Sequence, residues 1–155
     1  MRRSEQLKAR CHALVALVAA LLVLAASNPA HAGEKDTDAV VGVALALDLY
    51  VSGKSDAALA DLKKLLTTCA GTACEKSTRA QIQLAIGIVH AVGKKDLENA
   101  RLAFENALYE DATVTPDKQF TKPAVTTAFN AAKANFKKFG GQPPPSRPAP
   151  SKEQL

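Results

Sequence analysis

The first 32 residues decide which part of this chain is available to fold, because they have the three parts of an export signal. Four basic residues precede an apolar run of 14 residues, from 13 to 26. Ala30, His31 and Ala32 then give the small-x-small pattern that a signal peptidase recognises. We therefore expect cleavage between Ala32 and Gly33, which leaves residues 33–155 as the mature protein.

A retained membrane anchor is the alternative interpretation of this segment. A membrane-spanning helix needs about 20 apolar residues, whereas Ser27, Asn28 and Pro29 interrupt this run earlier. A lipid anchor is also disfavoured, because Cys11 precedes the apolar run and an acylated cysteine would follow it. We expect a periplasmic or secreted protein that keeps no membrane span after cleavage.

Removing the signal changes the charge of the protein. The whole chain has a net charge of +5, but the signal holds four of the 20 basic residues and one of the 15 acidic residues. The mature chain therefore carries 16 basic against 14 acidic residues. A nucleic-acid interface is expected to show a basic stripe. We interpret the lysine pairs at 63–64, 94–95 and 137–138 as separate pairs mixed with acidic residues on solvated helix faces, and expect no nucleic-acid partner.

Two cysteines remain in the mature chain, Cys69 and Cys74, with a separation of five residues. In an oxidising compartment this spacing favours a local disulfide, which a chain-entropy estimate credits with about 2 kcal/mol. A redox-active dithiol is the alternative, but no basic side chain lies between the cysteines to lower a thiol pKa. With the distant His90, the two thiols also fall short of a zinc ligand set. We expect no metal and no cofactor.

Helical periodicity and turn signals divide the mature chain into five helices without a convincing strand. The first covers residues 37–52 and ends at Gly53. The second opens at Ser55, a candidate N-cap, with Asp56 in the first turn. Its apolar stripe consists of Leu59, Leu62, Leu65 and Leu66.

The remaining helices follow from the same signals. The third covers residues 77–92 and ends at Gly93, where we expect a left-handed C-cap. The fourth opens at Asp96, and the fifth begins near Pro123, since proline is tolerated in a first turn. The fourth has Leu97, Ala100, Phe104, Ala107 and Leu108 on one face, and the fifth has Val125, Phe129, Phe136 and Phe139. The predicted fold class is all-α, in one helical domain over residues 33–139.

Residues 140–155 follow the glycine pair that ends the fifth helix. Five prolines lie between Pro143 and Pro150, and large apolar residues are almost absent. We therefore expect a disordered, polyproline-like spacer. Docking of this tail in an aromatic groove, with Arg147 beside the prolines, is the alternative.

Two stretches of the chain repeat one pattern of small and bulky residues. The first stretch contributes Leu45, Ala46, Leu49, Ala58 and Leu62, and the second contributes Ile86, Gly87, His90, Ala100 and Phe104. This pattern resembles that of tetratricopeptide repeats, in which the small residues let two helices of a hairpin approach closely. The resemblance covers residues 38–110. It implies two helical hairpins, with the fifth helix as a C-terminal solvating helix.

The pattern departs from the family in three respects. Both stretches lack the signature tryptophan and the closing proline. The separation of 42 residues between Ala58 and Ala100 also exceeds the family's repeat of about 34, because the loop with the two cysteines is inserted. A five-helix bundle unrelated to these repeats is the alternative.

The resemblance implies a concave groove, lined by the first helix of each hairpin, that binds a peptide or protein. It implies binding and not catalysis. The groove residues would be Val40, Val43, Leu47, Tyr50 and Val51 from the first hairpin, and Gln81, Leu84, Ile88, Ala91 and Val92 from the second.

The first helix is apolar on every side, because only Gly42 and Asp48 interrupt residues 40–51. Such a helix is expected to be buried nearly all round. Three partners can cover its second face: the fifth helix, a second copy in an isologous homodimer, or an apolar segment of another envelope protein. In the first case the covering residues would be Phe129, Phe136 and Phe139.

An enzyme is the competing class. Paired carboxylates at Glu105 and Asp111, or at Asp96 and Glu98, are candidates for acid–base chemistry, and His90 is a candidate base. Nucleophile, phosphate-loop, dinucleotide and zinc-protease motifs are all absent from the sequence. We therefore expect no catalytic residues. The expected function is non-enzymatic protein–protein interaction or scaffolding in the bacterial cell envelope, with a structural homo-oligomer as the alternative.

Overall fold

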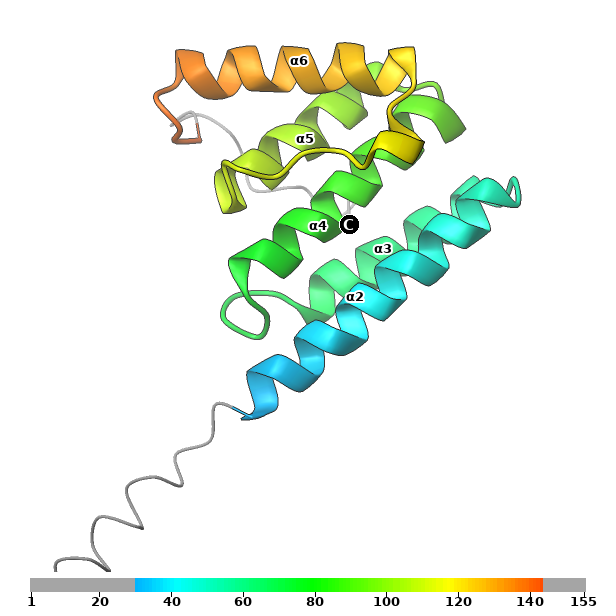
Figure 1. Cartoon of the computed structure of the whole chain (residues 1–155), viewed down its shortest axis with the longest axis vertical. Coiled ribbons are helices and arrows are strands. Elements are labelled where there is room, and N and C mark those ends of the chain that lie inside the picture. The colour runs from blue at the N-terminus through cyan, green and yellow to red at the C-terminus, as the bar shows by residue number, and fades with distance from the viewer. Residues whose placement is uncertain (1–29, 144–155) are drawn as a thin grey trace, which may run out of the picture. The chain divides into compact units, whose positions relative to one another are not determined.

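The computed structural model describes residues 30–143, which contain five α-helices and no strand. The α-helices are α2 (Ala30–Val51), α3 (Ser55–Thr68), α4 (Lys76–Ile88), α5 (Leu97–Glu110) and α6 (Pro123–Lys138). A π-helical turn, η1 (Val89–Gly93), continues α4, and a 3-10 turn, η2 (Lys118–Phe120), precedes α6 (Figure 1). The all-α prediction is confirmed. Most of the predicted signal (1–29) and of the proline-rich tail (144–155) lies outside the described residues.

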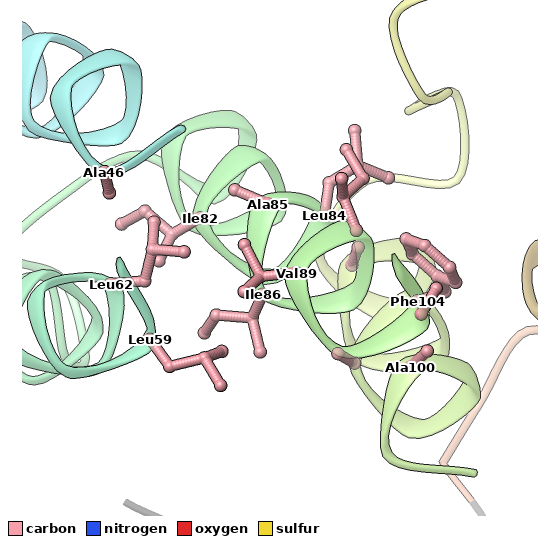
Figure 2. Close-up of a cluster of buried hydrophobic side chains, with 14 of the residues drawn as sticks. Ala46, Leu59, Leu62, Ile82, Leu84, Ala85, Ile86, Val89, Ala100 and Phe104 are labelled. Carbon is pink, nitrogen blue, oxygen red and sulfur yellow. The ribbon is translucent and has the colours of Figure 1, made fainter. Parts of the chain in front are cut away.

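Helix α4 lies between two layers of the domain. On one side, Ile82, Ile86 and Val89 lie beside Leu59 and Leu62 of α3 (Figure 2). On the other side α4 packs against α5, and α6 packs on α5 in turn. Each of the helices α3 to α6 therefore contacts the next one along the chain. Helix α4 packs against α3 on one side and against α5 on the other.

Small residues allow the helices to approach closely. A Cβ atom on Gly87 of α4 would lie only 2.4 Å from Cε1 of Phe104 on α5, and one on Gly42 of α2 would lie 2.8 Å from Cδ1 of Leu65 on α3. Ala46, Ala58 and Ala100 are buried as well. These residues, apart from Gly42 and Leu65, belong to the repeated pattern of the sequence, so the pattern marks real packing positions. Leu45 departs from it, because its side chain is 61% exposed.

Two predicted helix starts differ from the structure. Helix α2 begins at Ala30, well before the predicted residue 37, and no proline within residues 30–51 interrupts it. The predicted cleavage point after Ala32 therefore lies in the first turn of α2. Ser55 is the first residue of α3 and not its cap; Lys54 occupies the N-cap position, where no side chain accepts a capping hydrogen bond.

The predicted left-handed C-cap at Gly93 is wrong. The positive φ angle in this connection, 56°, belongs to Lys95. Gly93 has a different role, because a Cβ atom there would lie 2.4 Å from Oγ of Ser55 at the start of α3. The glycine is thus required by close packing, not by its backbone angle. The predicted start of α5 is confirmed, since Asp96 accepts a hydrogen bond from the Asn99 amide (3.0 Å).

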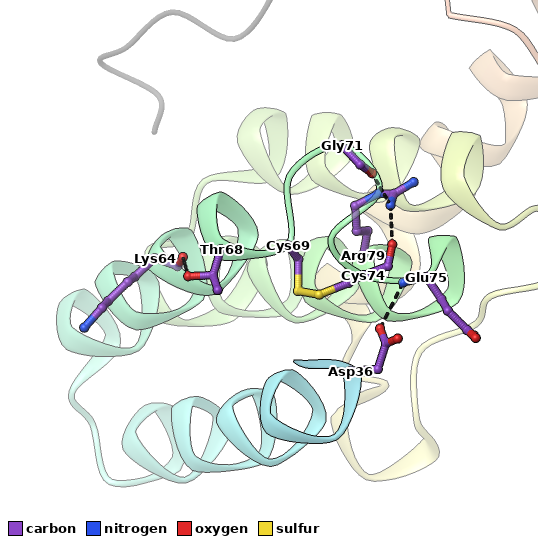
Figure 3. The surroundings of a disulfide bond; sticks show 8 residues. All are labelled: Asp36, Lys64, Thr68, Cys69, Gly71, Cys74, Glu75 and Arg79. Carbon is purple, nitrogen blue, oxygen red and sulfur yellow. Dashed lines mark hydrogen bonds between the residues drawn. A yellow bond between two sulfur atoms is a disulfide. The ribbon is translucent and has the colours of Figure 1, made fainter. Parts of the chain in front are cut away.

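The predicted disulfide joins Cys69 and Cys74 in the loop between α3 and α4. Arg79 of α4 fastens this loop by donating hydrogen bonds to the carbonyl oxygens of Gly71 (2.7 Å) and Cys74 (2.6 Å) (Figure 3). Its guanidinium group also pairs with Glu110 at the end of α5 (2.7 Å), and this pairing raises the pKa of Arg79. Arg79 therefore connects the loop to both α4 and α5, the two helices of the second hairpin.

Asp36 of α2 connects the first helix to the same region. Its Oδ1 atom accepts a hydrogen bond from the Glu75 amide (2.9 Å), at the N-cap position of α4. A carboxylate in this position accepts a hydrogen bond from one of the free N–H groups of a helix N-terminus. Its negative charge also interacts favourably with the helix dipole. The beginning of α2 is thereby fixed against the beginning of α4.

The contact between Gly87 and Phe104 predicts the effect of a single added methyl group. In an ordinary helix, Gly→Ala is stabilising by about 1 kcal/mol. We expect Gly87→Ala to lower the free energy of unfolding instead, by about 1–3 kcal/mol, because the fully buried Phe104 ring has no space to move. Urea unfolding measures this, and the loss should shrink when Phe104→Leu is the background. An alanine variant as stable as the parent would contradict the close approach.

Candidate functional site

A groove of about 720 Å³ lies between α2, α4 and the connection from α5 to α6. Each of the two helices contributes four residues at positions i, i+3, i+4 and i+7, which place them on one helix face. The residues are Val40, Val43, Ala44 and Leu47 from α2, and Gln81, Leu84, Ala85 and Ile88 from α4. The walls formed by α2 and α4 therefore have the same residue spacing.

The third wall is the connection over residues 114–120. The Asp117 carboxylate accepts a hydrogen bond from the Gln119 amide (3.0 Å), which starts the short turn η2. Phe120 then packs its ring against that of Tyr50 in α2, with 6.4 Å between the ring centroids. Together these contacts fix the wall against the last turns of α2.

The groove is mostly apolar and open to solvent at its rim. Its floor comes from α4, where Leu84, Ala85 and Ile88 are buried, whereas Val40 on the α2 side is 47% exposed. Asp117 and Lys118 are the charged residues of the lining, and both lie on the third wall. The arrangement offers apolar contact along two helices and polar contact along one edge.

The structure brings together six of the ten groove residues predicted from the sequence. These are Val40, Val43, Leu47, Gln81, Leu84 and Ile88. Tyr50 is buried behind the groove against Phe120, and Val51 is 70% exposed at the last residue of α2.

The π-helical turn η1 explains why the second hairpin departs from the predicted groove after Ile88. In this turn the Lys94 amide donates to the Val89 carbonyl (3.1 Å), five residues back. This wider turn rotates the following residues relative to the α-helical register. Ala91 is consequently buried in the core, and Val92 packs against the core outside the groove lining.

Of the three partners considered for the second face of α2, the fifth helix is excluded for the described residues, because no residue of α6 lines the groove. The Phe129 ring meets Phe104 of α5 edge-on (5.4 Å between centroids), and the Phe136 ring meets Tyr109 of α5 (5.5 Å). Phe139 is 40% exposed. The large apolar groups of α6 are therefore used against α5, and the residues near the groove are those of the connection that precedes α6. The sequence signal for this wall was weak: Val114, Pro116 and Phe120 in a segment without periodicity.

The expectation that α2 is buried nearly all round is also wrong for the described residues. Val41, Leu45 and Val51 are exposed on α2, in addition to Val40 at the groove rim. The helix packs through Ala39, Ala46 and Tyr50 instead. An apolar outer face of α2 is left facing solvent.

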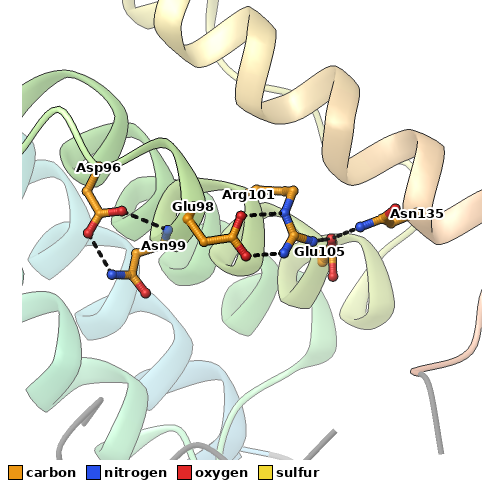
Figure 4. Close-up of polar contacts among 6 residues, drawn as sticks. All are labelled: Asp96, Glu98, Asn99, Arg101, Glu105 and Asn135. Atoms are coloured by element: carbon orange, nitrogen blue, oxygen red, sulfur yellow. Dashed lines mark hydrogen bonds and ion pairs between the residues drawn. The ribbon is translucent and has the colours of Figure 1, made fainter. Parts of the chain in front are cut away.

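The two carboxylates at the start of α5 have structural partners (Figure 4). Asp96 accepts hydrogen bonds from the backbone and side-chain N–H groups of Asn99, and these bonds lower the pKa of Asp96. Glu98 pairs with Arg101 one turn later, and this hydrogen bond raises the pKa of Arg101. Neither carboxylate lines the groove.

The second candidate pair, Glu105 and Asp111, is split between core and surface. Glu105 is 3% exposed, pairs with Arg101 and accepts a hydrogen bond from the Asn135 side chain of α6 (2.8 Å). Asp111 accepts hydrogen bonds from the side chain and backbone of Thr113, which lower the pKa of Asp111. Glu105 therefore links α5 to α6, while Asp111 shapes the turn after α5.

His90 lies half-buried in the turn η1. Burial lowers the pKa of His90 below its ordinary value of 6.5; the Asp96 carboxylate opposes this shift, and the charges of Lys63 and Lys94 add to it. The Nδ1 atom is buried without a hydrogen-bond partner. In the part of the chain that the structure describes, no three His, Cys, Asp or Glu side chains gather as a possible metal ligand set.

Comparison of the chain with protein-family models, with curated proteins and with solved structures gave no match. The resemblance to tetratricopeptide repeats therefore remains a prediction from the sequence pattern. None of the helices within residues 30–143 combines the length and apolarity that a membrane span requires.

The lowered pKa of His90 predicts how stability changes with pH. The unfolded chain binds a proton at this residue near pH 6.5, whereas the folded protein resists protonation. Stability is therefore fully present above this pH and is lost as the pH falls toward the folded pKa. We expect the urea midpoint to fall as the pH drops below about 6.5, where Asp96 and Asp111, whose pKa values are lowered, are still charged. In the His90→Gln variant the urea midpoint should change less with pH in this range. An unchanged pH dependence would contradict the role given to His90.

Proposed function

We propose that this domain is a non-enzymatic binding module whose groove holds an apolar segment of another protein of the bacterial cell envelope. The main support is the groove between α2, α4 and residues 114–120. Its volume of about 720 Å³ lies within the range of about 300–1,000 Å³ that is usual for ligand sites. No described segment of the chain fills it, and Val40 at its rim stays half-exposed.

The lining defines the chemistry of the partner. Two rows of aliphatic side chains favour a segment that is apolar on the side facing α2 and α4. The amide side chains of Gln81 and Gln119, both exposed, offer hydrogen bonds to the partner's backbone at the edges. Because Asp117 and Lys118 bring opposite charges to the same wall, the groove has no strong preference for a charged ligand.

The envelope location has two supports. The first is the export signal predicted for residues 1–32. The second is the disulfide between Cys69 and Cys74, since disulfides persist in oxidising compartments. The resemblance to tetratricopeptide repeats adds support for binding, because it implies a peptide- or protein-binding groove between the same helices.

A photo-crosslinking experiment in the native cell envelope tests the proposed function. Ala44 and Gln81 suit the probe, since both line the groove and both side chains are exposed. Lys64, exposed on α3 and outside the groove lining, is the matched control. We expect the probes at Ala44 and Gln81 to crosslink to the same second protein, and the probe at Lys64 not to. Crosslinks that are identical at all three positions, or that stay within the chain, would contradict a groove partner.

A structural homo-oligomer is the second candidate function, favoured by the apolar outer face of α2. Leu45 is 61% and Val51 is 70% exposed, and exposed apolar patches often mark contacts between proteins. A probe at Leu45 separates the two functions. A crosslinked product of twice the protein's own mass from Leu45, with none from Ala44 or Gln81, would replace the binding module with a homo-oligomer.

A further inference from the structure

Charge is divided unevenly along the mature chain. Residues 33–117 carry 13 acidic and nine basic residues, whereas no acidic residue lies between Asp117 and Glu153. Seven basic residues occupy that second stretch: Lys118, Lys122, Lys133, Lys137, Lys138, Arg147 and Lys152. The sequence interpretation of the 137–138 pair as mixed with acidic residues is therefore wrong, because it averaged charge over the whole chain.

Helix α6 presents its lysines to solvent. Its apolar face, Val125, Ala128, Phe129 and Ala132, is buried. Lys122 at the N-cap and Lys133, Lys137 and Lys138 in the last two turns are exposed. At 1.5 Å per residue, the backbone positions of Lys122 and Lys137 are about 22 Å apart. Positive charge thus lies at both ends of the helix, and residues 123–132 between them carry no charge.

These lysines are not neutralised by a described carboxylate. The ion pairs of residues 30–143 join Arg79 to Glu110, Lys94 to Asp56, and Arg101 to Glu98 and Glu105. Lys133 and Lys138 instead lie over the rings of Phe129 (5.1 Å) and Phe139 (5.7 Å). Lys137 and Lys138 also interact favourably with the negative C-terminal end of the helix dipole. That role does not account for Lys122 or Lys133.

We propose that α6 docks on a surface of anionic phospholipid headgroups. Lysines at both ends of an exposed helix are too far apart to share a single phosphate group and suit an extended anionic surface better. Near such a surface each lysine contributes favourably, and the attraction falls off within a Debye length. The acidic remainder of the mature chain is repelled, so the molecule is oriented with α6 toward the lipid.

The aromatic residues favour lipid over nucleic acid as the partner. Single-stranded nucleic acid binds on exposed aromatic platforms, but the rings of Phe129 and Phe136 are used in packing against α5. Phe139 remains 40% exposed, directly after Lys137 and Lys138. An exposed aromatic side chain beside basic residues is suited to the boundary between headgroups and acyl chains. This docking is independent of what occupies the groove.

Vesicle flotation with the exported protein tests the proposal. One set of vesicles contains phosphatidylcholine with about a third phosphatidylglycerol, and the other contains phosphatidylcholine alone. We expect binding to the anionic vesicles at least about tenfold stronger than to the neutral ones, and its loss at about 0.5 M salt. Equal binding to both sets would overturn the proposal.

Two matched variants locate the contact. Replacing Lys122, Lys133, Lys137 and Lys138 with glutamine should weaken vesicle binding at least about tenfold. The control replaces Lys54, Lys63, Lys64 and Lys76 with glutamine, which removes the same charge from the acidic part of the chain and should change binding by less than about twofold. Circular dichroism checks that both variants stay folded. Equal losses in the two variants would overturn the assignment to α6.

Competitors separate the lipid surface from other polyanions. Short duplex DNA and polyglutamate are added at the same charge concentration as the anionic vesicles. The proposal requires the vesicles to retain the protein. If either competitor removes it completely, the surface belongs to a nucleic-acid or acidic-protein partner and the lipid proposal is overturned.

Discussion

The contact of Phe104 with Gly87 is the interaction on which the arrangement of the helices depends. The absence of a side chain at Gly87 lets α5 approach α4, and Phe104 fills the space that remains. The Phe104 ring also makes a T-shaped contact with the Phe129 ring of α6. One buried ring therefore determines the spacing of three helices. Because α4 is held in this rotation, its Gln81, Leu84, Ala85 and Ile88 face remains available to form the groove wall.

The groove is open because α6 packs against α5 and not against α2. Phe129 and Phe136 pack against α5, and Asn135 donates to the buried Glu105 carboxylate, so α6 does not extend over α2. What reaches α2 is the connection before α6, through the contact of Phe120 with Tyr50. The same placement turns the lysines of α6 to solvent. The groove and the basic surface are thus two consequences of one packing arrangement.

Periodicity predicts the five helices and most of the groove, because residues at i, i+3, i+4 and i+7 share a face in any α-helix. It does not predict the turn η1, in which the Lys94 amide donates to the Val89 carbonyl and Gly93 lies close to Ser55 of α3. Residues 114–120 form a groove wall through tertiary contacts of Phe120, which leave no periodic signal. The charge of α6 was present in the sequence, but only a count over separate segments reveals it.

The central claim is that the connection before α6, and not α6 itself, borders the groove. The most direct measurement is a set of nuclear Overhauser effects from the phenylalanine rings of the exported protein, isotope-labelled, in solution. The structure predicts contacts of the Phe120 ring with Tyr50, and of the Phe129 ring with Phe104. Contacts of Phe129, Phe136 or Phe139 with Val40 or Leu47 would show a groove plugged by α6 and would contradict the account.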